Sequence, residues 1–355
     1  MEFPDTISFT ITNACNLRCR MCGQWSETGY VHKNPDRIKR EIGLSDWKRV
    51  TDELAANHIY SVLLRGGEVF LYPDVLELIE YINSKGIFIS IDTNGTVLGN
   101  YIKDLVRIGK MHLTFSIDGP EEIHDMVRGV PGSFRKMYQN IAALNDLEKE
   151  SPNTISKSIT FTVSPCSYKG LNRIPDIARS LGIGTITVVP YYYFTNKTVQ
   201  EYGQLVQKEF GCTAFSLKGF HHEESGIDIP AFKEEYRKYL ENLKGLYNFP
   251  YMGSTKDGFG LSDFVTWFQD TKTWAGTQRC MNVERFIDVQ PDGCVNFCTD
   301  FPDVGIGNIT EYSIKEIWNS EQADKFRKFR SEKVLPICVR CGAKYMSEIP
   351  DKIGR

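Results

Sequence analysis

The sequence predicts an α/β fold, an open or partial barrel of parallel strands in which each strand is followed by a helix. Short β-rich runs alternate with amphipathic helical stretches over roughly the first 195 residues. The β-rich runs are apolar along most of their length, as expected for parallel strands that are covered on both faces. Parallel strands need a crossover connection, which these helical stretches provide. In such a barrel the functional side chains lie on the loops that follow the strands.

Six runs rich in β-branched and aromatic residues are the expected strands, at 6–12, 60–66, 87–93, 111–119, 158–163 and 185–193. The helical stretches between them are 44–58, 73–86, 101–109, 132–150 and 168–182. The stretch 73–86 is an example of a predicted helix, because its apolar residues recur at helical spacing. Pro73 suits the first turn of this helix and Gly86 its C-terminal cap.

The alternation stops near residue 195, which divides the chain into three expected units. Residues 1–195 form the barrel, 196–275 form a linker or substrate-region segment, and 276–355 form a C-terminal unit. The middle segment contains one clear helical pattern, at 229–246. The C-terminal unit contains a hairpin-like run at 285–298, a helical stretch at 313–332 and a closing CVRC at 338–341.

Composition and charge exclude several classes of function. The 355-residue chain has a net charge of −3 and no block of Lys or Arg, so a nucleic-acid or membrane-surface partner is not expected. No run of 18 apolar residues indicates a membrane span, and MEFPDTISFTIT at the start has no signal-peptide pattern. Ten cysteines without an export signal favour metal or redox chemistry over disulfides. We therefore expect a cytoplasmic protein.

Three cysteines lie within eight positions, directly after the first expected strand. TNACNLRCRMCGQW (12–25) spaces Cys15, Cys19 and Cys22 as C-x3-C-x2-C. Structural zinc sites favour C-x2-C pairs and four protein ligands, so zinc fits this spacing poorly. Thiolates on one looping segment suit an iron–sulfur cluster. Three cysteines on a four-iron cube leave one iron open to an outside ligand.

Together with motifs after the later strands, this triad resembles the radical S-adenosylmethionine (SAM) superfamily. RGGEVF (65–70) follows the second strand, DTNGT (92–96) ends the third, SIDG (116–119) ends the fourth, and IHDMVRGVPGSF (123–134) comes next. The resemblance implies a partial (β/α)6 TIM-like barrel in which SAM chelates the open iron of a [4Fe-4S] cluster. It also implies that cleaved SAM yields a 5′-deoxyadenosyl radical, which abstracts hydrogen from the substrate.

The same resemblance assigns roles to individual residues. Cys15, Cys19 and Cys22 are the expected cluster ligands, and Arg128 is expected to pair with the SAM carboxylate. The full set of expected SAM contacts is Gly66, Gly67, Glu68, Asn94, Ser116, Asp118 and Arg128. The glycines are expected to let the backbone approach the SAM ammonium group.

Five more cysteines lie in the last 76 residues, at Cys280, Cys294, Cys298, Cys338 and Cys341. The C-x2-C pair at 338–341 is also compatible with a zinc ribbon. The frame from PDGCVNFC through GIGNITEYSIKEIW to CVRC resembles the C-terminal SPASM/twitch iron–sulfur domain of radical SAM enzymes. No cysteine follows Cys341, so the resemblance implies one auxiliary [4Fe-4S] cluster, held by Cys280, Cys298, Cys338 and Cys341. The G-x4-C pattern of the family favours Cys298 over Cys294, although either remains a candidate.

A cluster with four protein ligands is suited to electron transfer, because it has no open iron for a substrate. We therefore expect a net oxidation, either dehydrogenation of a small alcohol or sugar or oxidative modification of a peptide. The resemblance implies a flavodoxin- or ferredoxin-type electron donor. The first expected strand begins at residue 6, so we expect no fused N-terminal peptide-recognition domain. The alternative from another class is a non-catalytic zinc-binding interaction protein.

Cys166 is the candidate catalytic residue outside the cluster ligands. It lies in TVSPCSYKG after the fifth expected strand, a position that should face the mouth of the barrel. There it would serve as a hydrogen-atom donor or redox thiol. A packed, inert loop cysteine is the alternative.

Overall fold

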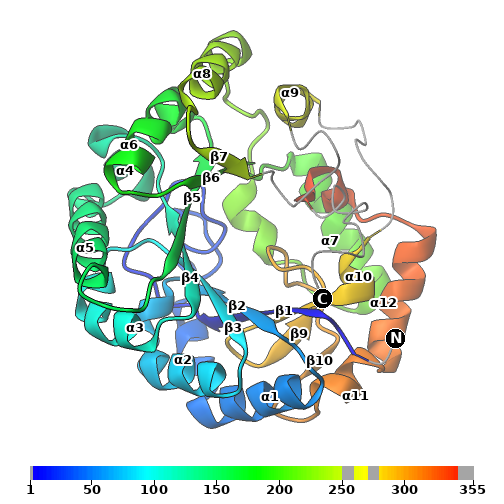
Figure 1. Ribbon diagram of the computed structural model, residues 1–355. Coiled ribbons are helices and arrows are strands. Elements are labelled where there is room, and N and C mark those ends of the chain that lie inside the picture. Colours follow the sequence, from blue (N-terminus) through cyan, green and yellow to red (C-terminus); the bar gives the residue numbers. More distant parts are fainter. Residues whose placement is uncertain (1–2, 250–259, 271–279, 343–355) are drawn as a thin grey trace.

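A computed structural model describes residues 3–249, 260–270 and 280–342. Within these residues ten strands form one sheet, in the order β10-β9-β8-β1-β2-β3-β4-β5-β6-β7. Its central part is the expected barrel of parallel strands, which Figure 1 shows as a curved wall. These strands are β1 (Thr6–Thr12), β2 (Ser61–Gly66), β3 (Phe88–Thr93), β4 (Met111–Ser116), β5 (Ser156–Val163) and β6 (Thr185–Pro190). The predicted α/β class is confirmed.

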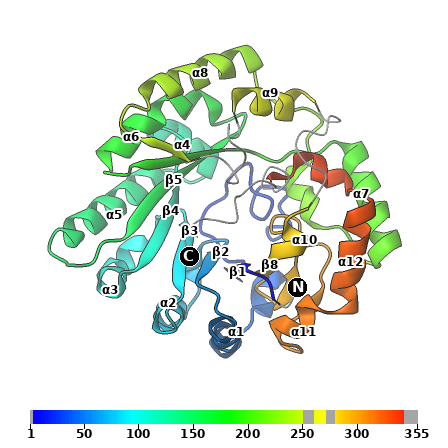
Figure 2. The ribbon, with the colours of Figure 1, turned by 45° about the vertical axis from the view of Figure 1, so that its right-hand side comes forward.

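The crossover helices lie on the outside of this wall (Figures 1 and 2). They are α1 (Leu44–Ala56), α2 (Val75–Ser84), α3 (Ile102–Ile108), α4 (Glu121–Arg128), α5 (Ser133–Glu148) and α6 (Ile174–Ser180). The inward faces of strands and helices share one core in which Phe9, Trp47 and Phe115 have no exposed surface. Burial of such side chains stabilises the fold by about 2–3 kcal/mol each.

Three local expectations need correction. The stretch 168–182 begins as a 3-10 turn at Tyr168–Arg173 before α6, and α4 is an additional helix. The stretch 313–332 divides into α11 (Ile314–Trp318) and α12 (Glu321–Glu332). The division occurs at Ser320, whose hydroxyl accepts a hydrogen bond from the Ala323 amide and caps a new helix.

Residues beyond the barrel extend the same sheet at both ends. β7 (Tyr247–Phe249) lies in the middle segment, where we expected no strand, and pairs parallel with β6. At the other end β8 (Phe286–Val289) pairs parallel with β1. β9 (Cys294–Asn296) then turns back beside β8, and β10 (Gly307–Asn308) follows it. The C-terminal hairpin is thus hydrogen-bonded directly to the first barrel strand.

A buried carboxylate lies at this junction between β8 and β1. Asp288 accepts hydrogen bonds from the hydroxyls of Ser8 and Thr10 on β1 and from the Gln290 side chain. The carboxylate has no exposed surface, and burial raises the pKa of Asp288 to about 7 although the Arg65 charge opposes this shift.

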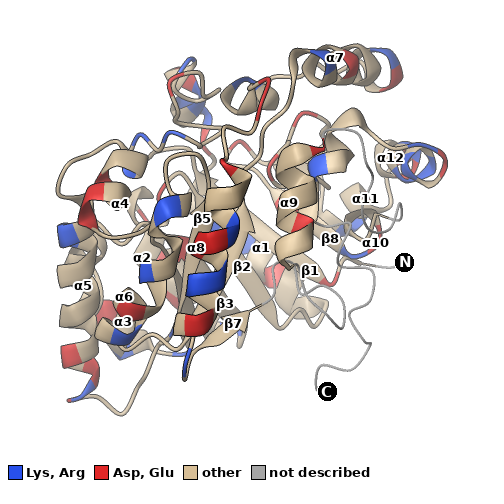
Figure 3. Ribbon diagram, turned by 90° about the horizontal axis from the view of Figure 1, so that it is seen from above, with Lys and Arg blue, Asp and Glu red and all other residues tan. Residues whose placement is uncertain are grey.

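The remaining helices are α7 (Asn196–Phe210), α8 (Ile229–Asn242), α9 (Leu261–Gln269) and α10 (Asn282–Arg285), together with α11 and α12. Among them, α7, α9, α10 and α12 lie on the side that the barrel strands leave open (Figure 1), whereas α8 packs beside α6 on the outer face and α11 lies next to α1. Acidic and basic side chains are mixed along α8 (Figure 3), where Arg237 pairs with both Glu234 and Glu241. Within the described ranges, no helix combines the length and apolar character needed to cross a membrane.

Candidate cofactor and substrate site

The first cysteine group lies on the loop that follows β1, as the sequence predicts. Cys15, Cys19 and Cys22 all line a cavity of about 250 Å³ at the carboxyl ends of β1–β4. The Cys22 amide donates to the Cys19 carbonyl at 3.1 Å, a turn that brings the second and third thiols to the same side of the loop. Five of the seven residues expected to contact SAM also line this cavity, namely Gly66, Gly67, Asn94, Ser116 and Arg128.

The electrostatics of these thiols favour a metal centre over free thiolates. Burial raises the pKa of Cys15 to about 12 and that of Cys19 to about 11. Charge on a neighbouring cysteine raises each pKa further, because thiolates close together repel one another. Without a cation the thiols stay protonated, whereas iron would hold all three as thiolates. The donor set therefore fits an iron–sulfur cluster.

The two glycines of RGGEVF have a role that the sequence did not predict. A Cβ atom on Gly67 would lie 2.2 Å from the Ala14 carbonyl oxygen, and one on Gly66 would lie 2.5 Å from that of Thr12. The Gly67 amide donates to Thr12 at 2.8 Å, so the β2 turn packs directly on the start of the cysteine loop. The glycines therefore position the loop as well as line the cavity.

Glu68 lies beneath the cavity, where it organises the neighbouring strand end. Its carboxylate accepts hydrogen bonds from the Thr93 hydroxyl at 2.7 Å and the Asn94 amide at 2.8 Å. It is 1% exposed, and burial raises the pKa of its carboxyl group. Glu68 therefore acts on this site through Asn94, which lines the cavity.

Asp118 and Arg128 form a buried ion pair at the edge of the same cavity. The Arg128 Nε lies 2.7 Å from Asp118 Oδ2, and Arg128 Nη1 lies 3.6 Å from the Cys19 sulfur. The backbone carbonyl of Arg128 also accepts from the Arg18 amide, which ties the end of α4 to the cysteine loop. Asp118 therefore orients Arg128, and Arg128 presents the charge to the cavity.

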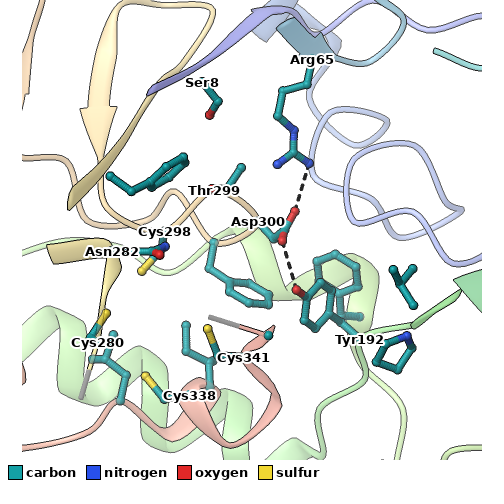
Figure 4. A pocket seen from close by; sticks show the side chains of 18 of the residues that line it. Ser8, Arg65, Tyr192, Cys280, Asn282, Cys298, Thr299, Asp300, Cys338 and Cys341 are labelled. Atoms are coloured by element: carbon teal, nitrogen blue, oxygen red, sulfur yellow. Dashed lines mark hydrogen bonds and ion pairs between the residues drawn. The ribbon is translucent and has the colours of Figure 1, made fainter. Parts of the chain in front are cut away.

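A second cavity, of about 450 Å³, contains the C-terminal cysteines. Cys280, Cys298, Cys338 and Cys341 all line it, and Figure 4 shows their sulfur atoms around a common space. They come from three segments: the two residues before α10, the loop after β9, and the 3-10 turn Pro336–Arg340 with the residue that follows it. The pKa of Cys298 is raised mainly by burial and further by charge on the three other cysteines, as expected for thiols that face one another.

Cys294 lies apart from this group, on β9. It lines a separate surface cavity of about 180 Å³ with Arg37, Asp292 and Asp303. A Cβ on Gly305 would lie 2.6 Å from its sulfur, so Cys294 packs against the chain that follows the hairpin. The tertiary arrangement thus favours Cys298 as the fourth member of the second cysteine group.

Both cysteine groups are arranged around a cavity. In the part of the chain that the structure describes, no three His, Cys, Asp or Glu side chains converge as a single metal ion requires. A four-iron cube is larger than one ion, so its ligands stand around a space rather than at one point. Both cysteine groups have this form.

The two cavities adjoin each other, and polar side chains line the region that they share. Met21, Arg65 and Asp92 line both cavities. Arg65 lies 3.1 Å from Asp300, whose other oxygen accepts from the Tyr192 hydroxyl at 3.1 Å (Figure 4). We did not single out Arg65, Asp92 or Asp300 from the sequence, although Arg65 and Asp92 are the first residues of the recognised motifs RGGEVF and DTNGT.

Cys166 follows β5 as expected; it is not among the described residues that line either cavity, but it is close enough to Tyr191, which lines the larger one, to act on that side chain. It is half-buried in the turn that precedes Tyr168. Its role as a hydrogen-atom donor stays a prediction.

Comparison with known proteins identifies the two units that hold the cysteine groups. The model of the radical SAM superfamily matches residues 9–162, and an iron–sulfur cluster-binding SPASM domain matches residues 280–342. The chain is a radical SAM enzyme with a SPASM domain. Its radical SAM domain binds a [4Fe-4S] cluster with SAM, and its SPASM domain binds auxiliary iron–sulfur clusters. The alternative of a non-catalytic zinc protein is not supported.

Relatives that match nearly the whole of this chain belong to the same subfamily. The radical SAM enzyme is 27% identical to an AdoMet-dependent heme synthase of Methanosarcina barkeri, over 99% of this chain and 97% of the relative. It is 24% identical to the subtilosin biosynthesis protein AlbA of Bacillus subtilis, over 97% of this chain and 68% of AlbA.

Solved structures share the fold of the radical SAM enzyme. SuiB of Streptococcus suis bound to S-adenosylmethionine superimposes with a TM-score of 0.65 at 15% identity, over 97% of this chain and 72% of SuiB. The structure described as native anSMEcpe with bound AdoMet gives a TM-score of 0.58 at 19% identity, over 97% of this chain and 91% of that one.

Proposed function

We propose that this enzyme carries out a net two-electron oxidation of a peptide, with the substrate side chain in the space between the two cysteine-lined cavities. The observation that carries this proposal is that the two cavities share Met21, Arg65 and Asp92 as lining residues. A group in that space would adjoin both centres. When bound, SAM and its cluster supply the hydrogen-abstracting 5′-deoxyadenosyl radical, and an auxiliary cluster accepts the remaining electron.

The proposed ligands follow from the geometry. Cys15, Cys19 and Cys22 hold the cluster that binds SAM, and Arg128 offers its guanidinium to the SAM carboxylate. Its partner Asp118 keeps that guanidinium in place at 2.7 Å. At the other centre the auxiliary cluster is held by four thiolates, Cys280, Cys298, Cys338 and Cys341, which leaves no ligand position for substrate. This complete set supports electron transfer as the role of the second centre.

The substrate space has apolar walls and a polar end. Tyr191, Tyr192, Phe220 and Phe301 line it. Their rings exclude water from a reactive intermediate and pack well on a side chain. Arg65 and Asp300 offer a donor and an acceptor for the polar groups of a peptide.

The relatives with peptide-related names support a peptide as the substrate, whereas the relative of Methanosarcina barkeri is a heme synthase. AlbA is a bacteriocin biosynthesis protein, and PqqA peptide cyclase of Rhodopseudomonas palustris is 24% identical over 92% of this chain and 76% of the relative. A small alcohol or sugar is the alternative substrate class. We propose a flavodoxin- or ferredoxin-type protein as the electron donor. Mass spectrometry of candidate peptides incubated with enzyme, SAM and reductant tests the proposal, and the expected product has lost two hydrogen atoms.

A matched pair of variants tests the second centre. Cys298→Ala is expected to lose the auxiliary cluster signal in Mössbauer or EPR spectra and to stop product formation, while it still cleaves SAM. Cys294→Ala, four residues earlier on the same hairpin, is expected to keep both clusters and most of the activity. Loss of the cluster in Cys294→Ala alone would move the ligand to Cys294. Full turnover in both variants would exclude electron transfer through this centre.

A further inference from the structure

An arginine lies at the wall of the cavity that the four C-terminal cysteines share. Arg330 is on the last turn of α12 and lines this cavity with Phe326 of the same helix. Its side chain is 6% exposed, and Nη1 donates a hydrogen bond to the Lys333 carbonyl. This contact holds the guanidinium against the cavity wall, where water screens its charge poorly.

The charge of Arg330 acts on the cysteine group. Arg330 lines the same cavity as Cys280, Cys298, Cys338 and Cys341, and it is buried there, so its charge acts on the space that these thiols surround. The guanidinium therefore favours negative charge at this centre.

Arg65, the other arginine that lines this cavity, lies next to carboxylates. Arg65 lies 3.1 Å from the Asp300 carboxylate, and the Asp92 carboxylate also acts on it. The carboxyl group of Asp288 acts on Arg65 as well, so nearby carboxyl groups reduce the field of this arginine. Arg330 is the arginine of this cavity that α12 contributes, and it lies within the unit that supplies the four cysteines.

We propose that Arg330 raises the reduction potential of the auxiliary cluster and so makes this centre a better electron acceptor. Reduction adds one negative charge to the cluster, and a buried cation stabilises the reduced form more than the oxidised form. The inference rests on the proposed ligand set of Cys280, Cys298, Cys338 and Cys341. In this proposal Arg330 acts on the cluster through its charge.

The same helix provides a matched control. Arg327 precedes Arg330 by three residues, but its guanidinium lies 4.3 Å over the Trp318 ring and donates to the Val283 carbonyl at 3.0 Å. Arg327→Gln therefore removes the same charge from the same helix without removing it from the cavity wall.

The experiment is an EPR-monitored redox titration of the cluster-loaded, full-length enzyme. Variants carrying Cys15→Ala, Cys19→Ala and Cys22→Ala isolate the auxiliary signal. On this background Arg330→Gln and Arg330→Met are expected to lower the equilibrium constant for cluster reduction at least tenfold, which corresponds to about 59 mV. Arg330→Lys keeps the charge and is expected to change this constant less than threefold, as is Arg327→Gln. Two neutral variants are used because one could fold poorly.

Several results would overturn the inference. Neutral variants with the midpoint of the parent enzyme would exclude a field effect. An equal shift in Arg330→Lys would assign the effect to the hydrogen bond with Lys333. Loss of the auxiliary irons from both neutral variants would make Arg330 a structural support of the cysteine loop. If Cys298→Ala keeps the auxiliary signal, the proposed ligand set itself fails, which is a separate outcome.

Discussion

Replacement of Asp288 by Asn should change how the stability of this enzyme depends on pH. Asp288 joins β8 to β1 and is completely buried among Ser8, Thr10 and Gln290. Burial raises its pKa from an ordinary value of 3.8 to about 7. The folded state therefore holds a proton that the unfolded chain has lost, throughout the range between these two values. An Asn side chain has no such proton.

The sign and size follow from proton linkage. Because the folded-state pKa is the higher one, the unfolding free energy of the parent enzyme falls as pH rises from about 4 to about 7, and this contribution is constant above pH 7. Each pKa unit corresponds to about 1.4 kcal/mol, so the whole window amounts to about 4 kcal/mol. Within the range from pH 5 to pH 8, the effect acts only up to the folded-state pKa of about 7, which is about two pH units. The stability of Asp288→Asn relative to the parent should therefore rise by about 3 kcal/mol between pH 5 and pH 8.

Urea unfolding of the cluster-loaded protein, followed anaerobically at pH 5 and pH 8, measures this difference. Asp146→Asn is the control, because the Asp146 side chain is 74% exposed and pairs with Lys149 on the surface. The other titrating groups are the same in all three proteins, so they cancel in the comparison. If Asp288→Asn follows the parent and Asp146→Asn within about 1 kcal/mol over this range, the carboxyl group is not held protonated at the β1–β8 junction.

Three further predictions concern the radical SAM domain. Joint replacement of Cys15, Cys19 and Cys22 by Ala should remove about four irons and abolish 5′-deoxyadenosine formation while the auxiliary cluster stays, because separate thiolate sets hold separate cubes. Continued SAM cleavage under dithionite would contradict the ligand assignment. Arg128→Gln removes a charge-assisted hydrogen bond and should weaken SAM binding about tenfold to a hundredfold, measured by calorimetry under anaerobic conditions; an unchanged affinity would place the SAM carboxylate elsewhere. Cys166→Ala should still cleave SAM but alter or leave unquenched the product seen by mass spectrometry, and an unchanged product yield would leave this thiol as packing.

The local secondary structure of the barrel could be predicted from the sequence. The six barrel strands and the crossover helices follow from hydrophobic periodicity and end residues, which act over a few neighbouring positions. Errors arose where one local interaction outweighed periodicity, as at Ser320, whose cap divides a continuous helical pattern into α11 and α12. The short strand β7 carries little pattern of its own and exists because β6 offers it hydrogen-bond partners.

The chemistry of the first centre was also readable, because its three cysteines lie within one loop. A local turn brings Cys15, Cys19 and Cys22 together. Their C-x3-C-x2-C spacing fits a structural zinc site poorly. The glycine and asparagine motifs were recognised by their resemblance to the radical SAM superfamily, and their positions after parallel strands predict that they lie at one face of the barrel.

Only the tertiary structure decided which distant groups meet. Cys294 and Cys298 differ by four positions, yet Cys298 faces Cys280, Cys338 and Cys341 while Cys294 packs beside Gly305. The pairing of Arg65 with Asp300 joins residues 235 positions apart. Such contacts depend on how whole strands and helices pack, and no short window of sequence contains that information.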